Sequence, residues 1–437
     1  MGACTTRLAF LVVTSLAAPA SIGIPDLIVR TTRIDDPGDL ARLIPTDLAP
    51  RDVFSWLRGG DGLVGWGRAA GIESSGIRRF RDAADWWHEV RSAATVRSEV
   101  DLAGSGLIAF GSFAFAAASP SGGSLVVPAT IVGRRAGTTW VTHVSERLEP
   151  GSAPRRYGAP TGPGTAAFND GSLNPVAWKN AVASAVDTVR SGQVDKVVMA
   201  RDVLAQTGAP IDPRWLIEHL STRYANTWTF AMDGLVGATP EMLVRRERGL
   251  VTSRVLAGTI QRTGDDSRDL ALAGSLARSS KDLEEHEYAV RSVADALRPH
   301  CTSMNVPESP FVLHLPNVMH LATDVVGVLA DYTTSLTLAE ALHPSAAVCG
   351  TPTDAAADLI SSLENLDRGR YAGPVGWLDA SGDGEWGIAL RCGQLDTGDP
   401  SRMRLFAGCG IVAGSVPEDE LAESESKLLP MREALTE

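Results

Sequence analysis

The chain has 437 residues, of which 44% are hydrophobic and 21% are charged, an ordinary soluble globular composition that can bury a large core. The formal net charge of −12 and the absence of a basic run disfavour nucleic acid as a partner, because phosphate binding relies on clustered Lys and Arg. Five widely spaced cysteines without a CxxC motif argue against a disulfide framework or a zinc site and favour a reducing compartment.

The N-terminus conflicts with a reducing compartment. Residues 1–27 contain an apolar run from Leu8 to Ala18 and an Ala18-Pro19-Ala20 triplet, a pattern that resembles a signal peptide. The run is too short to span a membrane stably. A secretion signal, an apolar strand and upstream sequence read from a misplaced start each explain it, and we treat residues 1–27 as a signal-like or misannotated leader.

Residues 28–173 form a predicted strand-rich subregion, in which short apolar runs alternate with Gly and polar breaks. The expected strands include "GLVGWG", "GLIAFGSFAF", "SLVVPATIVG" and "TTWVTHV", with "FRDAADWWHEVRSAA" as an intervening helix. Residues 149–172 are rich in Pro and Gly, which is typical of a linker or a long surface loop. We place the main internal boundary there.

Residues 174–437 begin with a helix, because Asn174 and Pro175 are a cap and a first-turn proline ahead of an apolar stripe. Strands are then expected in "DKVVMARDVLA", "WTFAMDG", "GLVGAT", "EMLVRR" and "LVTSRVLAG", followed by long helices around 270–298 and a hairpin turned at "SGDG". Strands and helices that come in separate runs predict an α+β fold: a large, mostly antiparallel sheet core with surrounding helices.

Two acidic pairs repeat one spacing. Asp282 and Glu285 lie in "SSKDLEEHEY", and Glu420 and Glu423 lie in "EDELAESESK". Residues three apart share one face of a helix, so each pair could offer two carboxylates to the same place. Facing helices of this kind suit Mg²⁺, whereas two solvated helix faces, or an ion pair from Glu423 to Lys427, are the structural alternatives.

Eight ordered motifs resemble those of the chorismate-binding enzymes, which include isochorismate synthases, salicylate synthases and the large subunits of anthranilate and aminodeoxychorismate synthases. The motifs are "DKVVMAR", "GATPEMLVRR", "LAGT", "KDLEEHEYAV", "LHPSAAVCGTP", "RYAGPVGWLD", "IALRCG" and "GCGIVAGSVPEDELAESESK". The resemblance runs from about Asn174 to the C-terminus and is weaker before it. It implies one large α+β domain whose deep cleft binds chorismate with one Mg²⁺.

The resemblance also implies roles for the acidic pairs. Glu285 and Glu423 match the metal ligands, and Asp282 and Glu420 match supporting carboxylates that orient water on the metal. The metal would hold the ring carboxylate of the substrate. One departure concerns the last helix, which Pro430 is expected to kink or end after Leu429.

Further matches concern the substrate. The expected cations at or near the enolpyruvyl carboxylate are Arg391 and Lys427, helped by backbone amides around Cys409, where the family more often has alanine. The other predicted substrate-binding residues are Gly258, Thr259, Ala347, Tyr371, Gly408 and Gly410.

Exchange of a ring hydroxyl for water needs a base and an acid on opposite faces of the ring. Lys196, at the start of an apolar strand, matches the family's water-activating base, and Glu241, in a tight turn, matches its general acid. Such a glutamic acid must stay protonated through desolvation. The structural alternatives are a strand-end lysine in solvent and a turn glutamate that caps a backbone amide.

These residues favour an isochorismate synthase. Lys196 matches the family members in which water, rather than ammonia, attacks the substrate, so no amidotransferase subunit is expected as a partner. Ala347 stands where salicylate synthases have threonine, and His343 is also typical of isochorismate synthases. Salicylate synthase is the alternative, and anthranilate or aminodeoxychorismate synthase and a non-catalytic binding protein are less favoured. We expect a cytoplasmic enzyme of menaquinone or siderophore biosynthesis that has no nucleic acid or membrane partner.

Overall fold

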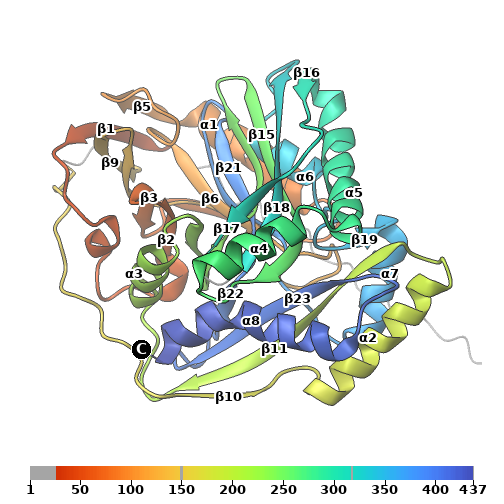
Figure 1. The fold of residues 1–437 in the computed structure, drawn as a ribbon. Coiled ribbons are helices and arrows are strands. Elements are labelled where there is room, and N and C mark those ends of the chain that lie inside the picture. Colours follow the sequence, from red (N-terminus) through yellow and green to blue (C-terminus); the bar gives the residue numbers. More distant parts are fainter. Residues whose placement is uncertain (1–25, 148–150, 316–317, 437) are drawn as a thin grey trace, which may run out of the picture.

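The computed structural model describes residues 26–147, 151–315 and 318–436 (Figure 1). The predicted leader lies almost wholly outside these ranges. Two extended β-sheets and the helices packed against them form one α+β domain, which confirms the predicted fold class. Within these ranges no helix combines the length and the apolar character needed to cross a membrane.

The first sheet has 13 strands in the described part of the chain, and only the pairing of β1 with β5 is parallel. Its order is β10 (Ala166–Asp170), β11 (Lys196–Thr207), β23 (Arg402–Ile411), β22 (Cys392–Leu395), β13 (Leu235–Thr239), β12 (Trp228–Met232), β2 (Val53–Arg58), β3 (Asp61–Trp66), β8 (Thr130–Arg135), β9 (Thr138–Ser145), β1 (Ile28–Ile34) and β5 (Thr95–Ser98), with β19 (Gly350–Thr351) paired to β11. The longest antiparallel ladder of this sheet joins β11 to β23.

The second sheet has 10 strands among the described residues, and all of its pairings are antiparallel. Its order is β16 (Cys301–Asn305), β18 (Val318–Leu329), β15 (Leu250–Gln261), β14 (Met242–Glu247), β21 (Gly384–Ile388), β20 (Pro374–Asp379), β6 (Ile108–Phe113), β7 (Gly123–Val127) and β4 (Ala70–Ser74), with β17 (Phe311–His314) paired to β18. The predicted hairpin at "SGDG" is the β20–β21 pair.

The two predicted subregions share both sheets. Strand β2 pairs with β12 in the first sheet, and β6 pairs with β20 in the second, so each sheet joins residues 28–173 to residues 174–437. The side chains between the sheets form a large buried cluster that includes Phe110 and Trp386. A second cluster fills the other face of the first sheet.

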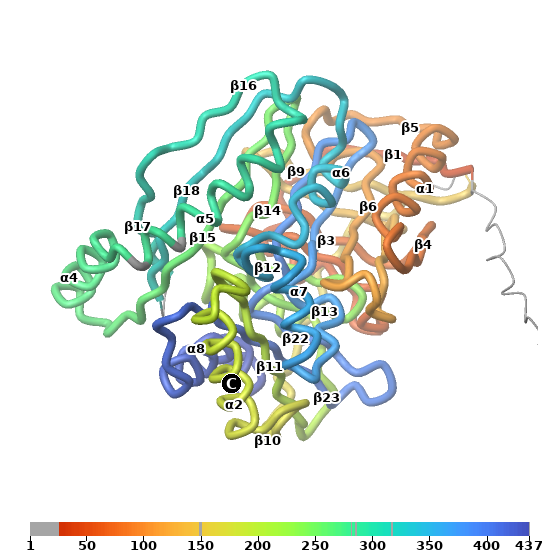
Figure 2. Tube along the Cα trace, turned by 90° about the vertical axis from the view of Figure 1, so that its right-hand side faces the viewer, coloured from red at the N-terminus to blue at the C-terminus, as the bar shows by residue number. Residues whose placement is uncertain are grey.

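Eight α-helices are present in the described ranges. They are α1 (Arg79–Ala93), α2 (Pro175–Arg190), α3 (Pro213–Arg223), α4 (Asp266–Leu276), α5 (Ser280–Leu297), α6 (Ser335–Ala341), α7 (Thr353–Leu363) and α8 (Pro417–Thr436), beside short 3-10 turns at Leu40–Leu43, Pro50–Asp52 and Arg298–His300. As predicted, the Asn174 side chain caps α2 by accepting from the backbone amide of Ala177. Helix α8 lies along β23 with α2 beside it, and α5 lies along β15 and β18 (Figures 1 and 2).

The expected linker contains a strand. Within residues 149–172, β10 pairs with residues 203–207 of β11, and the half-buried Phe168 packs against the second core cluster. The Pro and Gly residues around this segment gave no indication of a short edge strand. The strand is stabilised by pairing with β11, which is distant in sequence, rather than by its own composition. The Pro/Gly-rich stretch is therefore only partly a loop.

Pro430 does not end the last helix, which was one of the two outcomes expected for it. Helix α8 continues through Pro430 to Thr436, although proline removes one helical hydrogen bond at a cost of ~3 kcal/mol. Leu428, Met431 and Leu435 are all buried in the second core cluster on either side of the proline. Burying such side chains contributes roughly 1.5–3 kcal/mol each, which together offsets the cost of the proline inside the helix.

A buried ion pair joins several of these elements. Glu364, directly after α7, accepts hydrogen bonds from Nε and Nη2 of Arg368, and the side chains of Glu364 and Arg368 are only 1% and 2% exposed. Glu364 accepts a hydrogen bond from the amide of Ala200 at 2.7 Å. Arg368 donates to the carbonyl oxygens of Val198 at 2.6 Å and Val348 at 2.9 Å. The pair thus ties β11 to the loop before β19.

Glu364→Ala should lower the free energy of unfolding by ~3–5 kcal/mol, because it leaves the Arg368 charge buried without a partner. Urea unfolding followed by circular dichroism measures the change. Glu287→Ala is the matched control, since it removes an i,i+4 partner of Arg291 on the exposed face of α5 and should change stability little. Equal effects of the two substitutions would contradict the structural role of the buried pair.

Candidate active site

A cavity of about 190 Å³ opens where the first sheet meets α5, α8 and the second sheet. Most of the residues predicted from the motifs line it. They are Lys196, Glu241, Gly258, Thr259, Asp282, Ala347, Tyr371, Arg391, Gly408, Gly410, Glu420, Glu423 and Lys427. Residues that are separated by more than 200 positions in the sequence therefore converge on one space.

Glu285 lies in α5 at the predicted position, but its side chain is outside the described part of the structure. His343 is not among the residues that line the cavity. Its Nε2 lies 3.0 Å from the carbonyl oxygen of Phe115, so its contacts are with the packing around α6 rather than with the cavity.

Lys196 and Glu241 reach the cavity from different elements. Lys196 is the first residue of β11, is buried, and stands opposite Thr351 of β19 in the ladder. Glu241 lies between β13 and β14, where its backbone amide donates to Thr239 Oγ1 at 3.2 Å and its carbonyl accepts from the amide of Ile388 at 3.2 Å. Both backbones are thus held by pairing within the sheets.

Burial controls the protonation of Glu241. This side chain is 6% exposed, and loss of water raises its pKa to about 8, although the charges of Lys196 and Lys427 act in the opposite direction. The group is therefore a protonated acid at neutral pH. A carboxylic acid kept in this state can donate a proton.

One end of the cavity carries cations and a phenol. Lys427 Nζ donates to the carbonyl oxygen of Gly408 at 2.8 Å and lies 2.6 Å from Glu423 Oε1. The Tyr371 ring stacks on Phe406 at 5.1 Å, and burial raises the pKa of its hydroxyl, which stays a hydrogen-bond donor. With Arg391 on the same wall, this end suits a carboxylate.

Two glycines keep the walls open. A Cβ on Gly408 would come within 3.0 Å of the Met199 carbonyl oxygen and 3.1 Å of the Tyr371 hydroxyl. Gly258 has a φ of +76°, and a Cβ there would approach the Asp282 side chain to 3.1 Å. Both positions therefore need glycine for space, and Gly258 needs it for its backbone as well.

The sequence patterns missed two polar residues of the cavity. His320, on β18, places Nδ1 3.0 Å from Thr259 Oγ1, and burial together with Arg391 and Lys427 lowers its pKa to about 3, so the ring is neutral. Arg368 lines the cavity while holding Glu364. A lone histidine in the apolar run "VMHLA" carried no signal of chemistry, because single buried histidines are common in strands.

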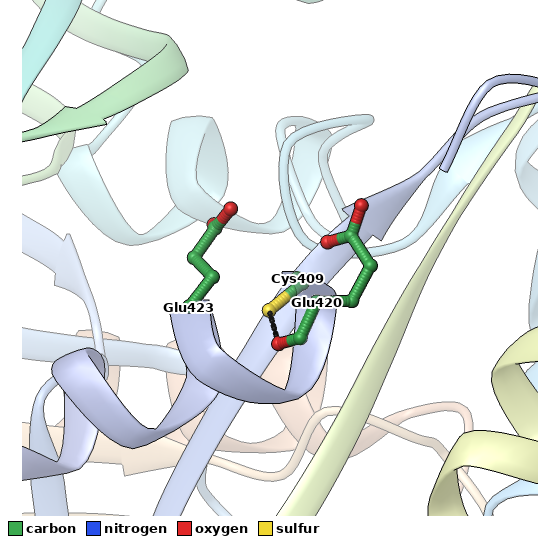
Figure 3. Close-up of side chains that lie close together, drawn as sticks. All are labelled: Cys409, Glu420 and Glu423. Atoms are coloured by element: carbon green, nitrogen blue, oxygen red, sulfur yellow. Dashed lines mark hydrogen bonds between the residues drawn. The ribbon is translucent and has the colours of Figure 1, made fainter. Parts of the chain in front are cut away.

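Three possible metal donors gather on β23 and α8 (Figure 3). The ligand atoms of Cys409, Glu420 and Glu423 all lie within 4.8 Å of one another. The two carboxylates point to the same side of the helix, as Figure 3 shows, and Asp282 lines the same cavity from α5. Carboxylate oxygens are the ligands that Mg²⁺ prefers, so this donor set fits the predicted ion.

A family model described as "Chorismate binding enzyme" matches residues 53–436. The chain belongs to this family. Isochorismate synthase DhbC of Bacillus subtilis is 40% identical over 273 residues, which cover 60% of this chain and 68% of that protein. The salicylate biosynthesis isochorismate synthase of Pseudomonas aeruginosa is 42% identical over 282 residues, which cover 63% of this chain and 58% of that protein.

A solved structure has the same fold. MenF, the menaquinone-specific isochorismate synthase from Escherichia coli, superimposes with a TM-score of 0.76 at 24% identity, covering 94% of this chain and 95% of that one. The predicted family resemblance is confirmed, and it extends into the strand-rich first part of the chain.

Glu241→Gln should make stability less dependent on pH. Folding raises the pKa of Glu241 from 4.5 to about 8, so between these values the folded state binds more protons than the unfolded state. The wild type should therefore lose up to ~1.4 kcal/mol of unfolding free energy per pH unit from this group as pH rises. Urea unfolding of both proteins across this range measures the difference, and a gap that stays constant with pH would contradict a protonated Glu241.

Proposed function

We propose that the protein is an isochorismate synthase, which converts chorismate to isochorismate with Mg²⁺. The observation that carries the proposal is the convergence of Lys196 and a protonated Glu241 on one cavity that is also lined by the cations Arg391 and Lys427 and by the carboxylates Asp282, Glu420 and Glu423. The names of the relatives support the same activity. A cytoplasmic location fits a substrate from central metabolism.

Substrate orientation comes first. Arg391 and Lys427 would bind the enolpyruvyl carboxylate, with the Tyr371 hydroxyl as a further donor. Glu423, with Glu285 and the supporting Asp282 and Glu420, would hold Mg²⁺. When bound, the ion supplies positive charge to the ring carboxylate of chorismate. This arrangement fixes the ring between the base and the acid.

Proton transfer follows from the positions of the two groups. Lys196, in its neutral form, would take a proton from the attacking water, and Glu241 would give a proton to the departing ring hydroxyl, which leaves as water. One water enters and one leaves, so the product is an isomer of the substrate. Burial of Glu241 supplies the proton at neutral pH, when an exposed glutamate would already be ionised.

Salicylate synthase is the second candidate, because the same cavity could continue by eliminating pyruvate. The small side chain of Ala347 lines the cavity and places no hydroxyl near the substrate. The Pseudomonas aeruginosa relative is named a salicylate biosynthesis isochorismate synthase, which supports isochorismate formation as the reaction of this chain. We therefore assign the first step to this chain, with water and no amidotransferase partner.

Purified protein given chorismate and Mg²⁺ near neutral pH should release isochorismate with little salicylate, and a chelator should stop the reaction. Liquid chromatography of the products, together with a pyruvate assay, checks both statements. Dominant salicylate with stoichiometric pyruvate would make the protein a salicylate synthase. If chorismate remained unchanged, the protein would be a binding protein without catalytic activity.

Lys196→Ala should slow the chemical step by at least ~100-fold while chorismate still binds, because neither carboxylate of the substrate depends on this lysine. Single-turnover kinetics and an affinity measurement separate the two effects. Lys179→Ala is the matched control. Lys179 lies on α2, its Nζ is 3.2 Å from Glu418 Oε1, and neither residue lines the cavity. Turnover of Lys196→Ala within about tenfold of wild type, ~1.4 kcal/mol in barrier, would remove Lys196 as the base.

A further inference from the structure

Cys409 places a thiol beside the carboxylates of the predicted magnesium site. Its side chain is 1% exposed on β23, and Sγ donates to the backbone carbonyl oxygen of Glu420 at 3.2 Å (Figure 3). The resemblance to the family places alanine here more often.

The spacing of the three donors fits one cation. Metal–sulfur bonds of about 2.3 Å and metal–oxygen bonds of about 2.1 Å allow two donors on the same ion to lie up to ~4.4 Å apart. The largest separation among Cys409, Glu420 and Glu423 is within 4.8 Å, so small side-chain movements bring all three to one ion. Glu420 and Glu423 come from α8 and Cys409 comes from the neighbouring β23, so the three donors belong to two different elements.

Sulfur changes which ions such a site prefers. Oxygen donors alone suit Mg²⁺, whereas a thiolate favours softer ions such as Zn²⁺ and Cd²⁺. Binding of these ions would release the thiol proton to solvent. The Glu423 side chain is 32% exposed, which gives an ion a path from solvent, and the ion would displace Lys427 from its pairing with Glu423.

We propose that Cys409 makes this a mixed oxygen–sulfur site, which binds thiophilic divalent cations more tightly than Mg²⁺ and excludes Mg²⁺ when they are bound. Both kinds of ion would bind Glu423 and lie beside Glu420, so they compete. The consequence for turnover, inhibition by Zn²⁺ or Cd²⁺ in the presence of Mg²⁺, rests on the proposed function. The binding itself does not.

Cys392→Ala supplies a matched control. Cys392 lies on β22, next to β23, and its thiol is free and fully buried like that of Cys409. Its Sγ donates to the Ala389 carbonyl oxygen at 3.4 Å, and it belongs to no group of potential metal ligands in the described part of the chain. Both thiols belong to the large core cluster, so comparison of the two variants isolates the effect of a thiol that lies close to Glu420 and Glu423.

The binding experiment titrates Cd²⁺ into the full-length protein, with Cys4→Ser and Cys301→Ser in every version, so that Cys349, Cys392 and Cys409 are the remaining thiols. Ultraviolet sulfur-to-cadmium charge transfer and calorimetry are the measurements. We expect the charge-transfer band in the parent and in Cys392→Ala, and its loss in Cys409→Ala, whose affinity for Cd²⁺ falls by at least ~10-fold. The affinity for Mg²⁺ should change much less. A band of equal strength, or an equal Cd²⁺ affinity, in Cys409→Ala would overturn the proposal.

A second measurement separates this inference from the proposed function. In isochorismate formation at fixed Mg²⁺, the half-inhibitory Cd²⁺ concentration should rise by at least ~10-fold in Cys409→Ala relative to Cys392→Ala. Turnover without the charge-transfer band would overturn only the metal inference. The band without any turnover of chorismate would support the mixed site and overturn the proposed function.

Discussion

The buried Glu364–Arg368 pair holds the cavity walls in place. It makes five hydrogen bonds where water cannot screen it, and three of them go to backbone atoms of β11 and of the loop before β19. Lys196 begins that strand, and Ala347 directly precedes the carbonyl that Arg368 binds. A charge pair so far from solvent has few alternative arrangements of comparable energy, which favours a single geometry of the site.

The cavity brings residues of both charges together in a chain whose formal net charge is −12. Lys196, Arg391 and Lys427 line it together with Asp282, Glu420 and Glu423. Lys196 and Lys427 act to lower the pKa of Glu241. Desolvation of Glu241 outweighs these charges, because burial disfavours the ionised form of the carboxyl group. The same cavity can therefore present an acid and attract an anionic substrate.

Much of the site could be predicted from sequence, because the informative residues lie in short motifs with strong local constraints. Asn174 and Pro175 fix a helix start, and the spacing of Glu420, Glu423 and Lys427 fixes a shared face that the structure shows. These signals are local. Their meaning as one site came only from the family resemblance, since no spacing rule links α8 to β11.

The features that were missed depend on distant partners. Strand β10 exists because β11 offers it an edge, and α8 passes Pro430 because the surrounding side chains are buried. His320 gives no sign of its place beside Thr259 until β15 and β18 pair. Each outcome was decided by tertiary packing that overrides local propensity, which a single sequence does not display.

The position of β23 affects how the chain folds during synthesis. This strand, Arg402–Ile411, fits between β11 and β22, although β11 is made about two hundred residues earlier. During synthesis β11 must wait with an unpaired edge until the ribosome has released almost the entire chain. Folding of the first sheet is therefore expected to finish late and to need protection from aggregation in the interval, since long-range strand pairing is slow.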